Sequence, residues 1–402
     1  MTASQAPLGD VADFYAGASL QEGEVWDNQE GGYLLTRVSD MNRAGNERCI
    51  LSARQWSADP GQKSATCPGD AIVIPKRGGA IGTNKKRILR RPAVLDPNLM
   101  AVKPREGVLD LDYLHQWFLT INLAKLASGS SVPQLNKKDL GPLHIPLPPL
   151  ARQKRIAAVL DQVDTLRAKR REAIGLLDDL AQSIFLDMFG NLQATGKVPL
   201  SSVANIASGI TKGRKEPSGE LQGVPYLAVA NVQDRKLNLS MVKEISVSAA
   251  ELERFKLRSE DLLLTEGGDP DKLGRGTLWR EELPVCIHQN HVFRVRVMDR
   301  EEIDPVYLSW VMSSRYGKSY FLRIAKQTTG IASINKTQLG DFPLPVSPIV
   351  RQREFRSRIE GVQAHQRAHR THLAALDELF TSLQHRAFSG TLWDHEATGE
   401  SA

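Results

Sequence analysis

The sequence contains 402 residues, which is long enough for two or three domains. Of these residues 41% are hydrophobic and 24% are charged, which is ordinary for a soluble globular protein, and the formal net charge of +6 is a modest basic excess. No run of about 18 apolar residues is present, which argues against a transmembrane helix, and we expect no secretory signal because the N-terminal segment lacks a basic region followed by an apolar one. The three cysteines, Cys49, Cys67 and Cys286, form no closely spaced pair, which argues against a disulfide scaffold or a zinc ribbon and favours a cytoplasmic protein.

Residues 1–150 combine short β-like runs, at 32–38 and 71–74, with a helical pattern at 111–126, which predicts an α/β (α+β) domain. A glycine-rich loop at 74–87 follows the second run. It has neither a Walker lysine nor a GxGxxG leading into a helix, so a nucleotide site is disfavoured. Its basic side chains suit DNA, because arginine can contact guanine and lysine can hold phosphate, although an ordinary surface turn is the alternative. The candidate DNA contacts in this part are Lys76, Arg77, Lys85, Lys86, Arg87 and Lys137.

Residues 151–190 follow the proline-rich stretch LGPLHIPLPPL and contain no proline. With Ile156 at heptad position a, the a and d positions are apolar except at Arg170 and Asp187, which predicts a long amphipathic helix with a coiled-coil seam. The prolines stop any helix before this point, and Gly190 stands where a C-terminal cap is expected. The residues that open this helix or line its seam are Arg152, Gln153, Ile156, Val163, Leu177 and Leu180.

Residues 191–350 again mix β-like runs, at 225–229, 261–265 and 292–297, with a helical pattern at 305–315, so a second α/β domain is expected. A second glycine-rich loop, 264–279, follows a strand. His288 and His291 are the nearest approach to a metal pair, but the aligned residues 96–99 of the first domain hold no such pair. We therefore interpret them as local structure or as recognition residues. The candidate DNA contacts here are Lys212, Arg214, Lys272, Arg275, Lys326 and Lys336.

Residues 351–390 repeat the helical pattern, and 391–402 are expected to form a flexible tail. The corresponding opening and seam residues are Arg351, Gln352, Leu376 and Leu379. Three histidines lie on one face of this helix at i, i+4 and i+7, a spacing at which imidazoles can share a metal ion. The matched positions of the first helix are Leu166, Arg170 and Ala173, which are not a ligand set, so we favour a structural or solvent-facing role and expect no metal. These histidines are His365, His369 and His372.

The chain is a tandem repeat. LGPLHIPLPPLARQKRI at 140–156 recurs as LGDFPLPVSPIVRQREF at 339–355, 199 positions later, and no insertion interrupts about 50 residues of this register. The upstream segments match more loosely, for example GDAIVI at 69–74 with EDLLLT at 260–265. Two matching helices in one chain are most simply partners in an antiparallel pair. We then expect a domain at each end of a rod of fixed length, related by a pseudo-twofold axis.

The duplicated proline-plus-RQ block, each copy followed by a long helix, resembles the specificity (S, HsdS) subunit of type I restriction-modification systems over nearly the whole chain. The stretches SVPQLNK and GIASINK, ending at Lys137 and Lys336, carry the same resemblance. It implies two target recognition domains, at 1–150 and 191–350, that each read one half of an asymmetric, bipartite DNA target. It further implies that the helices at 151–190 and 351–390 set the spacing and dock two methyltransferase (M) subunits, to which restriction (R) subunits add.

On this reading the chain is not itself an enzyme and binds no cofactor. It confers specificity on an adenine-N6 DNA methyltransferase, which holds S-adenosylmethionine, and on an endonuclease subunit that uses ATP and Mg²⁺. A single-chain methyltransferase or nuclease is disfavoured, because the Asn/Asp-Pro-Pro-aromatic motif is absent. A coiled-coil adaptor that binds only proteins, and a specificity subunit of a modification-based defence system without a restriction subunit, remain open alternatives.

Overall fold

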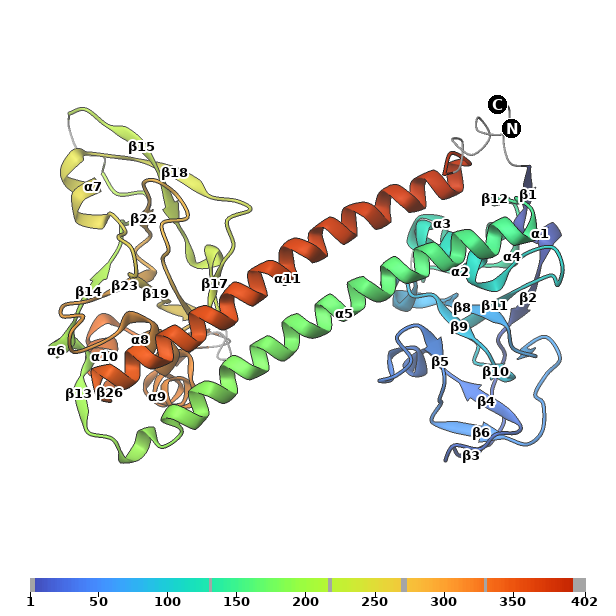
Figure 1. The fold of residues 1–402 in the computed structure, drawn as a ribbon, viewed down its shortest axis with the longest axis horizontal. Helices are drawn as coiled ribbons and strands as arrows, with labels where there is room; N and C mark the ends of the chain where they lie inside the picture. The colour runs from blue at the N-terminus through green and yellow to red at the C-terminus, as the bar shows by residue number, and fades with distance from the viewer. Residues whose placement is uncertain (1–3, 130–131, 216–218, 269–272, 329–330, 393–402) are drawn as a thin grey trace, which may run out of the picture. The chain divides into compact units, whose positions relative to one another are not determined.

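The computed structural model describes residues 4–129, 132–215, 219–268, 273–328 and 331–392, with the side chains of 326–328 and 331 outside that description. The chain divides into two compact units. Unit 1 comprises Met1–Glu172 with Arg370–Ala402, and unit 2 comprises Ala173–His369. Each unit therefore contains one α/β domain together with part of each long helix (Figure 1).

Unit 1 is built on two five-stranded sheets. One has the order β2-β11-β8-β9-β5, with β2 (Ala12–Ala16), β11 (Leu99–Pro104), β8 (Ala71–Pro75), β9 (Arg87–Leu89) and β5 (Cys49–Ile50). The other has the order β3-β6-β4-β10-β7, with β3 (Glu24–Val25), β6 (Gln55–Ser57), β4 (Tyr33–Thr36), β10 (Ala93–Leu95) and β7 (Thr66–Cys67). A short pair joins β1 (Gln5–Pro7) to β12 (His144–Pro146), and the helices are α1 (Leu8–Val11), α2 (Leu111–Thr120), α3 (Leu123–Leu126) and α4 (Lys137–Leu140).

The central strands of unit 1 are buried on both faces, which explains why their sequences are apolar without alternation. Ile72 and Ile74 of β8 lie in the core shared with α2, whereas Ala71 and Val73 lie in a second core on the other face of the strand. Leu34 of β4 belongs to that second core. Unit 1 is therefore layered as helices, central sheet and second sheet.

Unit 2 repeats this plan with a four-stranded central sheet. Its central sheet has the order β14-β23-β19-β21, with β14 (Ala204–Ser208), β23 (Val292–Val297), β19 (Leu262–Thr265) and β21 (Gly276–Leu278). Further sheets contain β18 (Lys243–Val247), β15 (Gln222–Leu227) and β22 (Ile287–His288); β13 (Lys197–Pro199) and β26 (Pro343–Pro345); β16 (Val232–Gln233) and β17 (Lys236–Leu237); and β20 (Gly267–Gly268), β25 (Ile331–Ser333) and β24 (Lys326–Thr328). The helices are α6 (Leu200–Val203), α7 (Ala249–Phe255), α8 (Pro305–Ser313), α9 (Arg315–Ile324) and α10 (Lys336–Gly340).

Corresponding strands of the two units occupy the same places, so the predicted internal repeat is confirmed. In both central sheets the order begins with the strand that follows the first short helix, β2 or β14. A glycine follows each of these strands, Gly17 and Gly209, and a Cβ there would lie 1.7 Å from the carbonyl oxygen of Asp96 and 1.9 Å from that of His288, respectively. Both positions therefore require glycine for the same close backbone approach.

The two long helices predicted from the apolar heptads are α5 (Leu150–Phe189) and α11 (Ile349–Ser389) (Figure 1). Each starts directly after a proline-containing segment, and α11 is followed by Gly390, whose φ of 84° is the left-handed conformation of a C-terminal cap. Within unit 2 the end of α5 meets the start of α11, since the rings of Phe189 and Phe355 lie 5.3 Å apart. The helices are therefore antiparallel, as expected.

The heptad register assigned from the sequence is partly wrong. Leu166, Leu180 and Leu379, all expected in the seam, are 40%, 47% and 46% exposed. Other positions are buried instead, among them Leu160 and Phe185, because much of each helix packs against a domain as well as against the other helix. A straight α-helix also drifts by roughly 20° per heptad from a 3.5-residue repeat, so a register set at Ile156 leaves the buried face farther along.

Within the part of the chain that the structure describes, no helix combines the length and the apolar character needed to span a membrane. The tail expected at 391–402 lies almost entirely outside the described residues.

Candidate nucleic-acid interface

The glutamines of the repeated Arg-Gln pair join each long helix to its domain. Gln153 is buried; its Oε1 accepts from the Asp110 backbone N–H at 2.9 Å, and its Nε2 donates to the carbonyls of Val108 at 3.0 Å and Pro148 at 2.9 Å. Asp110 is the N-cap of α2. Gln153 is thus a structural residue that satisfies three main-chain groups at the start of α5.

Gln352 makes the same three bonds in unit 2. It accepts from the Asp304 N–H at 2.9 Å, and it donates to the Glu302 carbonyl at 3.1 Å and to the Ser347 carbonyl at 2.6 Å. Asp304 is the N-cap of α8, the counterpart of α2. We call these two arrangements the glutamine joints. They give the glutamine of each repeated block the same structural role.

An aromatic contact lies beside each glutamine joint. The Tyr113 hydroxyl donates to the Pro146 carbonyl at 2.9 Å, and the Phe388 ring near the end of α11 lies 5.3 Å from that of Tyr113. In unit 2 the Tyr307 hydroxyl donates to the Pro345 carbonyl at 2.8 Å, and the Phe189 ring lies 4.8 Å away. The phenylalanine that ends one helix therefore packs where the other begins.

The remaining opening and seam candidates are distributed between core and surface. Ile156 and Val163 are buried in the core of unit 1, whereas Leu177 and Leu376 are half-buried. Arg152 is also half-buried. The exposed guanidinium of Arg351 lies 5.7 Å from the Phe189 ring.

Ion pairs also join the long helices to each other in unit 1 and α11 to its domain in unit 2. In unit 1 the Arg167 guanidinium bonds Asp377 at 2.6 Å and lies 4.4 Å from the Phe380 ring. In unit 2 Arg356 of α11 bonds Asp304 and Glu260, both at 2.6 Å. Burial alone would raise the pKa of Glu260, but the hydrogen bonds and charge of Arg356 outweigh it and hold that pKa below its ordinary value.

The basic candidates of the first glycine-rich loop differ in how far they reach solvent. Arg77 is exposed, whereas Lys76 is half-buried with its Nζ donating to the Gly17 carbonyl at 3.3 Å. Lys85 donates to Asn42, and Arg87 donates to the Met41 carbonyl at 3.3 Å. Arg77 is therefore the residue of this loop best placed to meet a polyanion.

Lys86 is not a surface residue, which corrects its interpretation as a DNA contact. It is 3% exposed, and its Nζ donates to the Ile121 carbonyl at 2.7 Å. Burial lowers the pKa of Lys86 to about 8, since the charged form loses its hydration. The sequence marks the residue as basic but does not show that the side chain turns inward.

Among the other candidates, Lys137, Lys212 and Lys336 are exposed. The Arg214 guanidinium is held by both carboxylate oxygens of Glu251, each at 2.7 Å, and Arg275 donates to Gln233 at 3.0 Å. Lys272, and the side chain of Lys326, lie outside the described residues.

The two histidines of the second domain have different roles. His288 is buried, its Nδ1 donates to the Val292 carbonyl at 2.7 Å, and burial lowers its pKa to about 4, so it is a neutral core residue. His291 is exposed, and its Nδ1 donates to Glu266 at 2.6 Å. Residues 4–392, apart from the gaps in the description, contain no group of three potential metal-ligating side chains. Within the helix trio, His365 and His372 are exposed and His369 is half-buried.

Glu266 is a further candidate that the sequence analysis did not select. It follows β19 directly, as Lys76 follows β8. Matching 69–74 with 260–265 aligns Glu266 with Pro75, one residue away from its structural counterpart. A shift of one residue moves a side chain to the other face of a strand, so only the backbone pairing reveals the correct correspondence.

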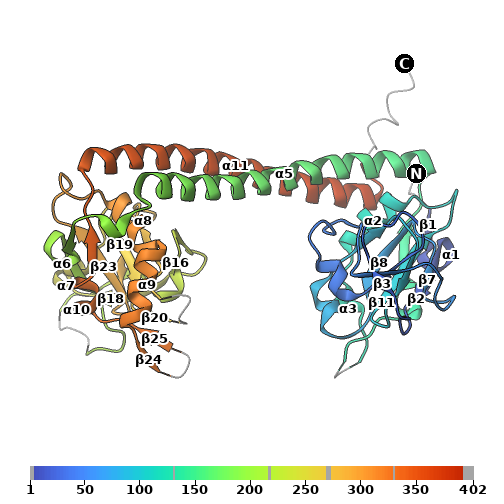
Figure 2. The same cartoon turned by 90° about the horizontal axis from the view of Figure 1, so that it is seen from below.

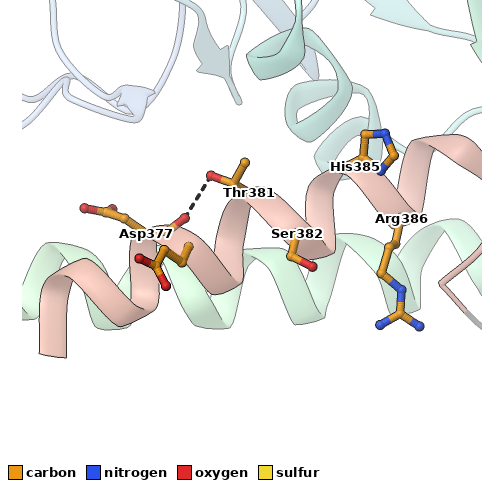
Figure 3. Close-up of a pocket in the computed structure, with 6 residues that line it drawn as sticks. Asp377, Thr381, Ser382, His385 and Arg386 are labelled. Carbon is orange, nitrogen blue, oxygen red and sulfur yellow. Dashed lines mark hydrogen bonds between the residues drawn. The ribbon is translucent and has the colours of Figure 1, made fainter.

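A shallow surface groove runs along α11 in unit 1 (Figure 3). It is lined by Asp377, Glu378, Thr381, Ser382, His385 and Arg386. The Thr381 hydroxyl donates to the Asp377 carbonyl at 2.8 Å, so part of this polar surface is satisfied by the helix itself.

These features define a chain with two related α/β domains, each joined in the same way to a long helix. Residues 5–175 match the family described as "Type I restriction modification DNA specificity domain". The resemblance predicted from the repeated blocks is therefore confirmed.

Curated relatives extend the match. The chain is 24% identical to the EcoBI specificity subunit of type I restriction enzyme from Escherichia coli, over 96% of this chain and 85% of that one. It is 25% identical to the EcoKI specificity subunit of Escherichia coli strain K12, over 67% of this chain but only 62% of the relative. The fold is similar to that of the S subunit from M. genitalium, with a TM-score of 0.57 and 14% identity, over 96% of this chain and 99% of that one.

Proposed function

We propose that this chain is the DNA-specificity subunit of a type I restriction-modification complex of a bacterium or archaeon. Each α/β domain reads one half of an asymmetric bipartite target, and the unread spacer lies between the halves. The repetition of one domain frame on two glutamine joints, with different loops, carries this proposal, because it provides two similar readers with different surface chemistry. The predicted division into domains at 1–150 and 191–350 and helical regions at 151–190 and 351–390 belongs to the same proposal.

The partners and cofactors follow from this role. Two methyltransferase subunits dock on the long helices, whose exposed leucines and α11 groove offer contact surface, and restriction subunits add to that assembly. S-adenosylmethionine belongs to the methyltransferase subunit, and ATP with Mg²⁺ to the restriction subunit. The chain itself is non-catalytic and acts in the cytoplasm, where it meets chromosomal DNA.

Methylome sequencing tests the proposal. A host without other adenine methyltransferases is given this chain with its methyltransferase partner, and we expect methylation within one asymmetric, split sequence. Omission of this chain should abolish that pattern. Methylation without sequence preference, or a pattern independent of this chain, would contradict the proposal and favour an adaptor that binds only proteins. Methylation by the purified chain with S-adenosylmethionine alone would instead favour a single-chain enzyme.

A further inference from the structure

The two units hold one pair of positions in the same backbone frame. In unit 1 the Lys76 N–H donates to the Asn98 carbonyl at 2.7 Å, and the Lys76 carbonyl accepts from the Leu135 N–H at 2.8 Å. In unit 2 the Glu266 N–H donates to the His291 carbonyl at 3.0 Å, and the Glu266 carbonyl accepts from the Ile334 N–H at 2.9 Å. Lys76 therefore corresponds to Glu266, and Asn98 to His291.

The next residue confirms this register. Arg77 pairs in an antiparallel bridge with Gln134, and Gly267 pairs in the same way with Ser333. Gln134 and Ser333 are 199 positions apart, the interval of the repeat. Position by position, the sequence Lys76-Arg77 of unit 1 is replaced by Glu266-Gly267 in unit 2.

The side chains in this common frame have opposite charge. Unit 1 presents the exposed guanidinium of Arg77, which has no hydrogen-bond or ion-pair partner among the residues that the structure describes, next to the ammonium of Lys76. Unit 2 presents the Glu266 carboxylate with His291, whose side chains are 31% and 56% exposed. An identical backbone with exchanged polar groups is the arrangement expected where two readers differ only in what they read.

The frame lies beside a basic residue that both units share. Leu135 and Ile334, which bond to Lys76 and Glu266, are each followed two residues later by an exposed lysine, Lys137 or Lys336. Phosphate contacts position a protein on DNA and carry no sequence information, whereas base contacts specify. A lysine present in both units would suit a phosphate contact, and the neighbouring polar residues that differ between the units would suit base contacts.

The frame of unit 2 also lies at a free end of its unit. Glu266 directly precedes β20, and the sheet β20-β25-β24 lies at the end of unit 2 remote from α5 and α11 (Figure 2). This frame is thereby kept apart from the helices on which partner subunits are proposed to dock.

We propose that Arg77, supported by Lys76, and Glu266, positioned by His291, are specificity-determining residues of the two domains, at neighbouring positions of this common frame. This inference rests on the proposed function. Arginine donates to the O6 and N7 acceptors of guanine, while a carboxylate accepts from the exocyclic amino group of cytosine. Unit 1 therefore reads a guanine at this position, and unit 2 reads a base that offers an amino group in the major groove, cytosine or adenine.

The test uses the full chain in complex with its methyltransferase subunits. Competition binding is measured on duplexes in which each base pair of the wild-type target is varied in turn. We expect Arg77→Ala to reduce discrimination at one guanine of the unit 1 half-site about tenfold or more, and Glu266→Ala to do the same at one base pair of the unit 2 half-site. Glu266→Lys, which installs the unit 1 residue, should move the preference toward guanine.

Glu301→Ala is the matched control, since it removes an exposed carboxylate of unit 2 that pairs with Arg353 at 2.6 Å near the start of α11. It should leave discrimination at every base pair unchanged. The inference is overturned if Arg77→Ala and Glu266→Ala also leave it unchanged, if they weaken binding to all sequences equally, or if each acts on the other unit's half-site. A wild-type complex without any split preference would refute the proposed function itself, which is a separate outcome.

Discussion

At the scale of single residues, the glutamine joints are sites where one substitution is expected to be costly. Replacing Gln153 or Gln352 by leucine leaves a backbone N–H and two carbonyls without partners, in positions that are buried or part-buried. Because each buried unsatisfied group costs about 1–3 kcal/mol, we expect each variant to lose about 3 kcal/mol of unfolding free energy. Urea unfolding monitored by circular dichroism measures this loss.

Gln162→Ala is the control for this experiment, since Gln162 is an exposed position of the same helix. Its effect should stay within about 0.5 kcal/mol. Equal stability of Gln153→Leu and the wild-type chain would show that the three bonds of the joint contribute nothing.

In contrast to the glutamine variants, we expect a substitution of the buried Lys86 to stabilise the chain. Its pKa is about 8 in the folded chain, whereas the ordinary value of 10.5 applies when the chain is unfolded. The unfolded state therefore binds more protons between these pH values, so stability rises as pH increases from 8 to 10.5 and is lowest below pH 8. Lys86→Met should remove this pH dependence and raise the unfolding free energy at pH 7 by on the order of 1 kcal/mol, after the loss of its bond to Ile121.

Unfolding curves at pH 7 and pH 10 measure both effects. Lys85→Met, at a neighbouring lysine that is less buried, serves as the control and should leave the slope with pH unchanged. A destabilised Lys86→Met chain at pH 7 would show that the hydrogen bond to the Ile121 carbonyl outweighs the cost of burying the charge.

At the scale of elements, substitution of the exposed leucines of the long helices should affect subunit association but not the stability of the fold. Leu180 and Leu379 are 199 positions apart and nearly equally exposed, so Leu180→Ser and Leu379→Ser should change the unfolding free energy by less than about 0.5 kcal/mol. If methyltransferase subunits dock on these helices, each variant should weaken that association. Analytical ultracentrifugation of the mixed subunits measures it, and Leu160→Ala, which should cost about 2–5 kcal/mol of stability, is the contrasting core variant.

The elements themselves were largely predictable from the sequence. The apolar runs at 71–74 and 261–265 became central strands because a strand buried on both faces has no polar alternation. The expected helix at 111–126 is instead two helices, broken around Ile121, whose carbonyl receives Lys86. The helix seam was predicted less well, because a heptad pattern does not show which helix positions pack against a domain in the tertiary structure.

The candidate site residues could be selected by residue type from the sequence, but their exposure could not be predicted. Basic loop residues were recognised, yet Lys86 turns inward and its Nζ donates a hydrogen bond to a carbonyl 35 residues away, a contact that no local pattern reveals. Glu266 was missed because an acidic residue beside a glycine-rich loop carries no signal until the two domains are aligned through their backbone pairing.

At the scale of the whole molecule, the repeat predicts modular specificity. Replacing residues 200–335 with the equivalent segment of a related chain should change one half-site of the methylated sequence and leave the other half-site and the spacer unchanged. The reason is that both long helices are retained with Gln153 and Gln352, and that Gln352 bonds only main-chain atoms of the replaced segment, those of Glu302 and Asp304. Methylome sequencing of hosts that carry each chimera measures the outcome, and a swap that altered both half-sites would contradict independent reading by the two domains.

The partners of the joint glutamines have a consequence for how such a protein diversifies. All three bonds of Gln153 and all three of Gln352 are made to main-chain atoms, so they do not depend on which side chains the attached domain carries. A foreign domain imported by recombination can therefore form the same hydrogen bonds to the joint glutamine, provided that its backbone follows the same path. New target sequences can arise in this way by shuffling whole domains, without a series of compensating point mutations at the attachment.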